Sequence, residues 1–159
     1  MEQMANPMNA LLEIQEALNS NTPFDVPELD GGYKTWFNEN SKGKKHTFAK
    51  IINGEIQALA IFGFVDPVEG IECWSLGYAV NENYRRRGLA VEAVKTGIEE
   101  FKKIYSRNSL KSFYIEGVID IENNPSIKLA EKIFSSTGRR IIDEESGRPA
   151  LLFEKLIVI

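Results

Sequence analysis

The residues best suited to chemistry form a short basic loop, Arg85-Arg86-Arg87-Gly88-Leu89-Ala90. Each guanidinium group can bind phosphate oxygens through paired hydrogen bonds. Gly88 has no Cβ, so a ligand can come close to its backbone. If a helix begins here, its first amides lack partners and its dipole makes that end positive, which suits a phosphate. The loop is a candidate anion site, although the motif taken alone could equally be a solvated basic turn.

The segments on either side are predicted to place this loop between a strand and a helix. Residues 71–80 are rich in aromatic and aliphatic side chains, which is typical of a buried strand. After the loop, apolar residues recur at three- and four-residue steps on one helix face, at Val91, Val94, Ile98, Phe101 and Tyr105. A strand over 112–119 should then run parallel to 71–80, because a strand–helix–strand crossover joins parallel neighbours.

A second polar segment, Asn123-Asn124-Pro125-Ser126, precedes another amphipathic stretch. Asn124 can cap a helix, and Pro125 suits the first helical turn. Gly138 is expected to end this helix. The two asparagines could do no more than turn and cap the chain.

The remaining elements follow from periodicity and turn signals. They are a helix over 10–18 with Asn9 as its possible cap, a loop over 20–31, a short helix over 33–40, and strands over 45–52, 55–64, 139–143 and 149–158. Pro23 and Pro27 predict the break in the loop. Asn53-Gly54 predicts a tight hairpin, and residues 66–70 a second turn.

The composition narrows the class of protein. The chain has 159 residues, 43% hydrophobic and 26% charged, as in one soluble globular domain. A net charge of −4 argues against a nucleic-acid binder. The single cysteine, Cys73, excludes an internal disulfide and fits a cytoplasmic location, where we expect it to be a buried small hydrophobe. We expect neither a membrane span nor a secretory signal.

Arg85-x-x-Gly88-x-Ala90 between a strand and a helix resembles the acetyl-CoA pyrophosphate loop of the GNAT N-acetyltransferase superfamily. The wider run over 76–93 is similar to the branch that includes the ribosomal-protein N-terminal acetyltransferases, and Asn123-x-x-Ser126 is a second match. The resemblance covers about residues 45–157. It implies a single α/β domain over 1–159, with a mixed, mostly antiparallel sheet flanked by helices. Members usually carry a strand before the first helix, and the family builds its amine-side pocket partly from this region. No such strand is identifiable here, so the resemblance does not define that pocket.

The resemblance implies that the protein binds acetyl-CoA as a co-substrate. The pyrophosphate would lie on Arg85, Arg86, Arg87, Gly88, Leu89 and Ala90. The pantetheine arm would follow the main chain of Tyr78, Ala79 and Val80 and then reach Asn123 and Ser126. No metal is expected, because His46, the only histidine, lies among lysines, reads as exposed and has no companion ligand.

The implied reaction is acetyl transfer to a primary amine by direct attack in a ternary complex. An alkyl ammonium has a pKa of about 10, so a general base is needed. Glu72 is the expected base and Glu116 its rival, although Glu72 could be an ordinary surface carboxylate. Many members place a tyrosine four positions after Ser126 as the thiolate proton donor; here that position is Ala130, and Ser126 is the nearest substitute.

Several alternatives stay open. The acceptor could be a protein N-terminus, a polyamine or an antibiotic amine, and the protein could form a homodimer. Trp74 and Tyr78 are expected to be core aromatics rather than side-chain contacts to a substrate. The competing function is a non-catalytic acetyl-CoA or CoA sensor of the same fold, motivated by Ala130 and the missing first strand. An unrelated nucleotide-phosphate binder is the third possibility.

Overall fold

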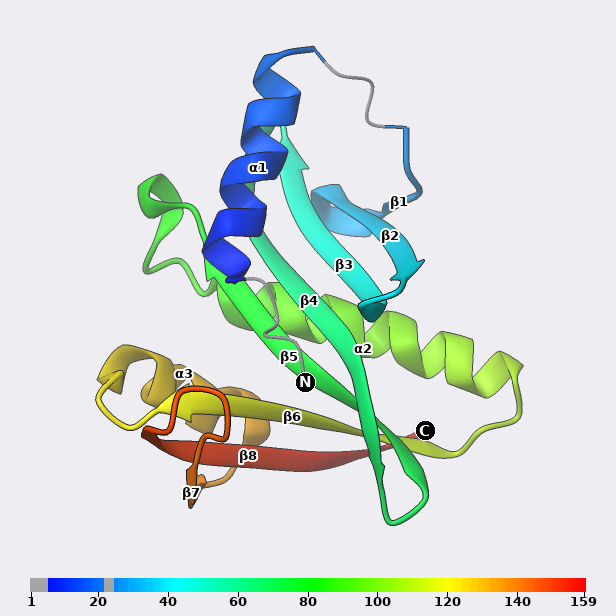
Figure 1. The fold of residues 1–159 in the computed structure, drawn as a ribbon. Helices are drawn as coiled ribbons and strands as arrows, with labels where there is room; N and C mark the ends of the chain where they lie inside the picture. Colours follow the sequence, from blue (N-terminus) through cyan, green and yellow to red (C-terminus); the bar gives the residue numbers. More distant parts are fainter. Residues whose placement is uncertain (1–5, 22–24) are drawn as a thin grey trace.

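The computed structural model describes residues 6–21 and 25–159, which contain one sheet of eight strands (Figure 1). The helices are α1 (Pro7–Asn19), α2 (Leu89–Arg107) and α3 (Asn124–Phe134). The strands are β1 (Glu28–Leu29), β2 (Tyr33–Asn40), β3 (Gly43–Ile52), β4 (Glu55–Val68), β5 (Ile71–Val80), β6 (Ser112–Asp120), β7 (Arg139–Ile142) and β8 (Pro149–Val158). Their order across the sheet is β1-β2-β3-β4-β5-β6-β8-β7.

All neighbouring strands are antiparallel except β5 and β6, which run parallel and are joined by α2. This arrangement confirms the predicted α/β class and the mixed, mostly antiparallel sheet. The predicted hairpin at Asn53-Gly54 is confirmed, because both residues have positive φ, 51° and 75°, and Ile52 lies opposite Glu55. The predicted strand over 71–80 has the observed bounds of β5.

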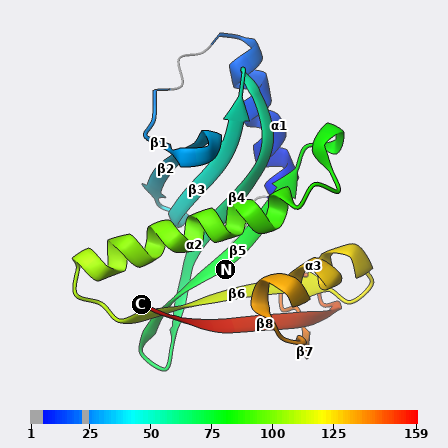
Figure 2. The ribbon, with the colours of Figure 1, turned by 180° about the vertical axis from the view of Figure 1, so that it is seen from behind.

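The helices cover different parts of the sheet. α1 packs on one face, against β4 and β5. α2 and α3 lie together on the other face, α2 over β3, β4 and β5, and α3 over β6 and β8 (Figure 2). The loop before α2 and the first turn of α3 therefore both belong to the second face.

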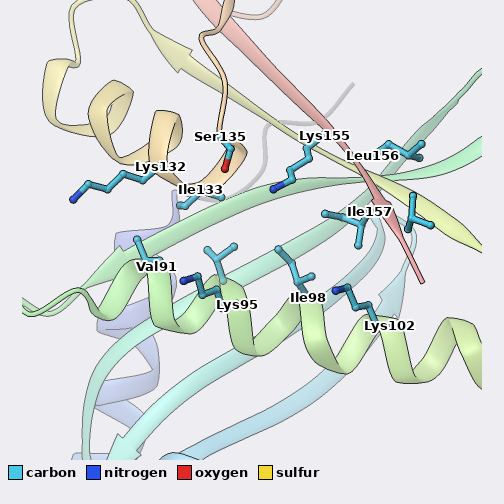
Figure 3. Close-up of a pocket in the computed structure, with 12 residues that line it drawn as sticks. Val91, Lys95, Ile98, Lys102, Lys132, Ile133, Ser135, Lys155, Leu156 and Ile157 are labelled. Atoms are coloured by element: carbon cyan, nitrogen blue, oxygen red, sulfur yellow. The ribbon is translucent and has the colours of Figure 1, made fainter.

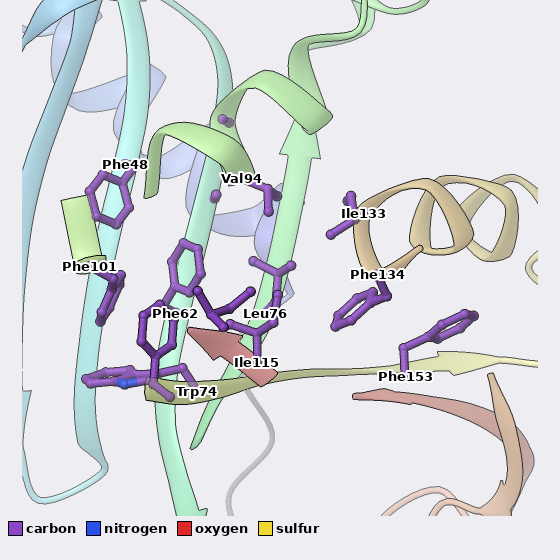
Figure 4. Close-up of a cluster of buried hydrophobic side chains, with 14 of the residues drawn as sticks. Phe48, Phe62, Trp74, Leu76, Val94, Phe101, Ile115, Ile133, Phe134 and Phe153 are labelled. Atoms are coloured by element: carbon purple, nitrogen blue, oxygen red, sulfur yellow. The ribbon is translucent and has the colours of Figure 1, made fainter. Parts of the chain in front are cut away.

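The larger core lies under α2 and α3 and is dominated by aromatic rings (Figure 4). The Phe101 ring of α2 lies 4.9 Å from the Phe62 ring and 4.8 Å from the Trp74 ring, between centroids. A Cβ at Gly97 would collide with Phe62, so α2 can lie close to β4 only with glycine there. This packing fixes the position of α2, and hence of the loop at its start.

The predicted helix over 33–40 is wrong, because this segment forms β2, antiparallel to β3. It contains Tyr33, Thr35, Trp36 and Phe37, residue types that favour a pleated, half-buried strand. Tyr33 is buried, and its hydroxyl donates a hydrogen bond of 2.8 Å to a carboxylate of α2, Glu92. Short apolar runs do not distinguish helix from strand by spacing, and here the pairing with β3 decides.

The ends of two predicted elements near the start of the chain also shift. α1 begins at Pro7, and its cap is Asn6 rather than Asn9: the Asn6 side chain accepts a hydrogen bond of 3.0 Å from the Met8 amide. β4 continues to Val68, so the turn predicted over 66–70 narrows to its last two residues. The register of β4 against β5 is irregular there, which lets the strand run past Pro67.

α3 differs from its prediction at both ends. Its cap is Asn123, not Asn124, because the Asn123 side chain accepts a hydrogen bond of 3.3 Å from the Ser126 amide. The helix ends at Phe134, where Ser135 takes the left-handed conformation with φ 53°. Gly138 does not end it. A Cβ at Gly138 would lie 2.8 Å from Cβ of Leu151, so this glycine permits close packing instead.

Among the residues described, no strand precedes α1, and β1 and β2 supply the outer strands after that helix. The predicted break at Pro23 lies outside the described residues. Within the described part of the chain, no helix is both long enough and apolar enough to cross a membrane.

Candidate functional site

The sheet divides where β5 and β6 separate. The two strands pair only over Cys73–Ser75 and Tyr114–Glu116, and their later residues have no partners in each other. The Asn81 amide donates to the Gln57 carbonyl of β4 at 2.9 Å. Because backbone groups alternate sides along a strand, the N–H and C=O groups of Tyr78 and Val80 point away from β4, toward the diverging β6. These backbone groups can form hydrogen bonds with an extended segment that lies beside β5.

The basic loop lies at the end of this open edge of β5. Arg86 and Gly88 have positive φ, 65° and 72°, and α2 begins at Leu89 with no side chain capping its first amides. Arg85, Arg86 and Arg87 are exposed, and none forms a salt bridge within the described residues. A Cβ at Gly88 would meet no protein atom within 4 Å, so its backbone is open to a ligand.

The loop therefore offers uncapped amides and positive charge together. Successive N–H groups around residues of alternating handedness form an anion-binding concavity, and the α2 dipole adds to its field. Positive φ is a second reason for glycine at position 88, because a residue with a Cβ is strained in that conformation. The structure confirms that the loop joins a strand to a helix, the context on which its interpretation depends.

The start of α3 faces β5 across the divergence. The Tyr78 hydroxyl donates to the backbone carbonyl of Ser126 at 3.4 Å. Burial raises the pKa of Tyr78 to about 12, so its hydroxyl keeps its proton at neutral pH. Asn123 uses its side-chain oxygen as the cap and retains its amide N–H groups. Tyr78 is half-buried, and its hydroxyl forms a hydrogen bond at this edge. The prediction of Tyr78 as a core aromatic did not include this contact.

Glu72, the expected base, lies near the start of β5, before the paired segment. It shares strand parity with Trp74, so it points to the α2 face. There its carboxylate accepts a hydrogen bond of 2.8 Å from the Tyr105 hydroxyl, which in turn accepts one of 2.9 Å from the Trp74 indole. The Tyr105–Glu72 contact joins the end of α2 to the sheet, far from the basic loop at its beginning.

Glu116, the rival base, lies where the strands part. It is opposite Ser75, the last paired residue of β5, and Glu154 of β8 is its other neighbour. Phe113 and Ile115 point to the core under α2, so Glu116 points to the opposite face. Burial raises the pKa of the Glu116 carboxyl, and the charge of Glu154 adds to this effect. The sequence could not supply that neighbour, since it depends on the register of β6 and β8.

The two other candidate residues, His46 and Cys73, are half-buried and buried. His46 is half-buried rather than exposed: its ring stacks on Phe48 with centroids 4.6 Å apart, and Nε2 lies 2.8 Å from the Thr35 hydroxyl. Burial lowers the pKa of His46. Cys73 is buried, as predicted, and burial raises the pKa of its thiol to about 12. Within the described residues, no cluster of three or more histidine, cysteine or acidic side chains could hold a metal ion.

Comparison with known proteins agrees with this geometry. The sequence matches the family model "Acetyltransferase (GNAT) family" over residues 11–135. The chain belongs to this family. The divided sheet and the loop before α2 are therefore those of a GNAT family member. A search of curated proteins finds no match.

Solved structures with this fold include a GNAT acetyltransferase from Streptococcus pneumoniae, at 16% identity and a TM-score of 0.54 over 98% of each chain. The NatB acetyltransferase complex bound to CoA and MES matches at 18% identity and a TM-score of 0.56, over 70% of this chain and 72% of that one. RimL, a ribosomal-protein α-N-acetyltransferase in complex with coenzyme A, matches at 14% identity and a TM-score of 0.51, over 71% of this chain. At such identities the likeness shows the fold alone.

This chain spans less than two-thirds of the length of some of these proteins. It covers 62% of the RimL chain and 64% of a Bordetella pertussis GNAT acetyltransferase, which matches over 70% of this chain at 23% identity and a TM-score of 0.49. The substrates and partners of these longer proteins are therefore not assigned to this one.

Proposed function

We propose that this protein transfers an acetyl group from acetyl-CoA to a primary amine by direct attack in a ternary complex. One observation carries the proposal: β5 separates from β6 after Ser75, and from its open edge the chain continues through a short turn and the arginine loop to the uncapped start of α2. A thioester carrier needs a site for an extended amide-bearing arm and a site for a diphosphate. The chain offers both in the required order.

The residues present fit acetyl-CoA as follows. Amides from Arg86 to Ala90 would bind the pyrophosphate, with Arg85 and Arg87 supplying charge at the mouth. Main-chain groups of Tyr78 and Val80 would bind the pantetheine arm in the manner of an added strand. An amide at this edge would also stabilise the oxyanion as the thioester carbonyl is attacked. The Asn123 amide group lies on the facing helix start and can donate to the same arm.

We propose Glu116 rather than Glu72 as the general base. Glu116 lies at the point of separation and has a raised pKa, which improves a carboxylate as a base near neutral pH. Glu72 is already held by Tyr105 at the other end of α2. Glu116 accepts the ammonium proton, directly or through water, and the freed amine lone pair forms the new bond to the carbonyl carbon.

The leaving sulfur then departs on the opposite side of the sheet. Tyr78 shares strand parity with Trp74 and Leu76 and so points to the α2 face, whereas Glu116 points to the other. When the carbon–sulfur bond breaks, the thiolate can receive a hydrogen bond or a proton from a hydroxyl on the α2 side. Ser126 and Tyr78 both lie there, in contact through the Ser126 carbonyl. The proposed base for the amine and the proposed hydroxyl donors for the thiolate thus lie on different faces of the sheet.

The acceptor is an amine that approaches from the Glu116 face. Protein N-termini, polyamines and antibiotic amines all meet this requirement. The second candidate function, a CoA-binding sensor without turnover, rests on Ala130, which lies buried where many superfamily members carry a tyrosine. Both candidates require the same cofactor loop and differ only in turnover.

A thiol-release assay with acetyl-CoA and a panel of peptide, polyamine and aminoglycoside acceptors separates the two functions. We expect amine-dependent thiol release that Glu116→Gln slows by about 100-fold or more. Tight acetyl-CoA binding without release across the panel would favour the sensor. Absence of acetyl-CoA binding would refute both.

A further inference from the structure

A concave site lies between α2, α3 and β8 and extends along α2 from Val91, the residue after the loop (Figure 3). Its volume is about 390 Å³, within the range of small-molecule sites. Its floor is apolar and includes Val91, Val94, Ile98, Ile133 and Ile157. Val91 and Ile98 are half-buried and can contact the hydrophobic body of a small ligand, above the buried side chains of Val94, Ile133 and Ile157.

The charged part of the lining is entirely cationic. Four lysines from three elements border the cavity, Lys95 and Lys102 from α2, Lys132 from α3 and Lys155 from β8. No acidic side chain lines it, and within the described residues only Lys102 among the four forms an ion pair, with Glu99 at 3.4 Å. This concentration of positive charge occurs in a chain whose net charge is −4. An anion bound among these ammonium groups would offset their mutual repulsion.

The cavity is separate from the proposed acetyl-CoA site. None of residues 85–90 lines it, nor do Asn123 and Ser126. Lys155 lies opposite Ile115, in the part of the sheet where β5 and β6 are still paired. The open backbone edge of β5, on which we place the pantetheine arm, begins after Ser75. In Figure 3, Lys155 extends from β8 toward α2, and Ile98 rises from α2 into the same space.

We propose that this cavity binds a small molecule with an apolar body and a phosphate or carboxylate head group. The half-buried Val91 and Ile98 contact the body, and the ammonium groups of Lys95 and Lys155 bind the head group, with the exposed Lys132 at the rim. Lysine binds such groups as a flexible point charge, which suits anions without a fixed planar geometry. The proposal does not depend on acetyl transfer, since no residue of the proposed reaction lines the cavity.

The test uses decyl phosphate as the probe, titrated calorimetrically into the full chain below its micelle concentration. We expect saturable binding of one molecule per chain. 1-Decanol and inorganic phosphate, which each lack half of the proposed chemistry, should bind at least about tenfold more weakly, the ratio that corresponds to one lost contact with a charged group. Equal affinity for decanol, or no saturable binding of decyl phosphate, would overturn the proposal.

Variants locate the site. The double variant Lys95→Gln/Lys155→Gln, and separately the exposed Lys132→Gln, should weaken decyl phosphate binding by about tenfold and about threefold respectively. Lys103→Gln is the matched control, because it removes the same charge from the same helix outside the cavity, and its affinity should stay within about twofold. An equal loss in Lys103→Gln would indicate non-specific attraction. Saturating acetyl-CoA should leave the affinity unchanged, and displacement would show that the cavity is part of the cofactor site.

Discussion

Gly88 has two roles at the scale of a single residue. Its positive φ lets the chain turn from the arginine loop into α2, and its missing Cβ exposes the amides that follow. Arg86 takes the same left-handed region without being glycine, which costs about 1 kcal/mol. Strain in a loop that carries a ligand site is common, because the ligand geometry rather than local stability selects the conformation.

Gly88→Val should reduce acetyl-CoA affinity by about 100-fold or more, since losing about two hydrogen bonds to a charged group costs about 3 kcal/mol. The strained φ should lower the free energy of unfolding by only about 1–2 kcal/mol. Gly54→Val is the matched control, because Gly54 also has positive φ, 75°, and open surroundings but lies in the β3–β4 hairpin. Calorimetry should show the affinity loss in Gly88→Val alone, and an equal loss in both would refute the loop assignment.

Glu116→Gln should lower kcat by about 100-fold or more, the usual contribution of a general base. Its raised pKa means that the native protein holds this proton more tightly than the unfolded chain does. Ionised Glu116 therefore lowers native stability as the pH rises from its ordinary pKa of about 4.3 through its raised value. The variant should melt at a higher temperature than the wild type at pH 7, with the difference shrinking at pH 4. Unchanged kcat would remove Glu116 as the base.

Ser126→Ala and Tyr78→Phe compare the two hydroxyls on the thiolate side. The residue that assists departure of the sulfur should, when replaced, lower kcat by about tenfold or more while leaving acetyl-CoA affinity within about threefold. Steady-state kinetics with a thiol-release readout measures both quantities. If each variant loses binding and turnover equally, both hydroxyls serve only to hold the helix start against β5.

At the scale of elements, the start of α3 combines capping with a possible ligand contact. Asn123→Asp keeps an oxygen that can accept from the Ser126 amide but loses the N–H donors, whereas Asn123→Ala loses both. Only the alanine variant should destabilise the fold, by about 1 kcal/mol. Both should weaken acetyl-CoA binding if the amide donates to the pantetheine arm. Denaturant titrations and calorimetry separate the effects, and full affinity in Asn123→Asp would leave the cap as the only role.

Elements with strong local signals were predictable from the sequence. Asn and Gly are the residues that best tolerate positive φ, so the hairpin follows from Asn53-Gly54 alone. The periodicity after Gly88 locates α2 to within two residues of its end. β2 was not predictable in this way, because its identity comes from pairing with β3. The neighbours of Glu116 were hidden for the same reason: they depend on the register between β6 and β8, which no local pattern encodes.

At the scale of the whole molecule, the helices cover the two faces of the sheet unequally. α1 covers one face beside β4 and β5, while the face of β6 and β8 that carries Glu116 and Glu154 has no helix over it among the described residues. The opposite face is filled by α2, α3 and the aromatic core, which hold the loop before α2 in place. In our proposal, the amine approaches the point of strand separation from this side.

The central claim is that the start of α2 binds the diphosphate of acetyl-CoA, and thermal unfolding with candidate ligands tests it most directly. At a concentration of about 100 times its dissociation constant, acetyl-CoA should raise the free energy of unfolding by about 2.7 kcal/mol. For a chain of this length that corresponds to about 5–11 °C in Tm. ATP and NAD at the same concentration should leave Tm unchanged, and Gly88→Val should abolish the acetyl-CoA shift. Stabilisation by ATP or NAD without any shift from acetyl-CoA would contradict the account.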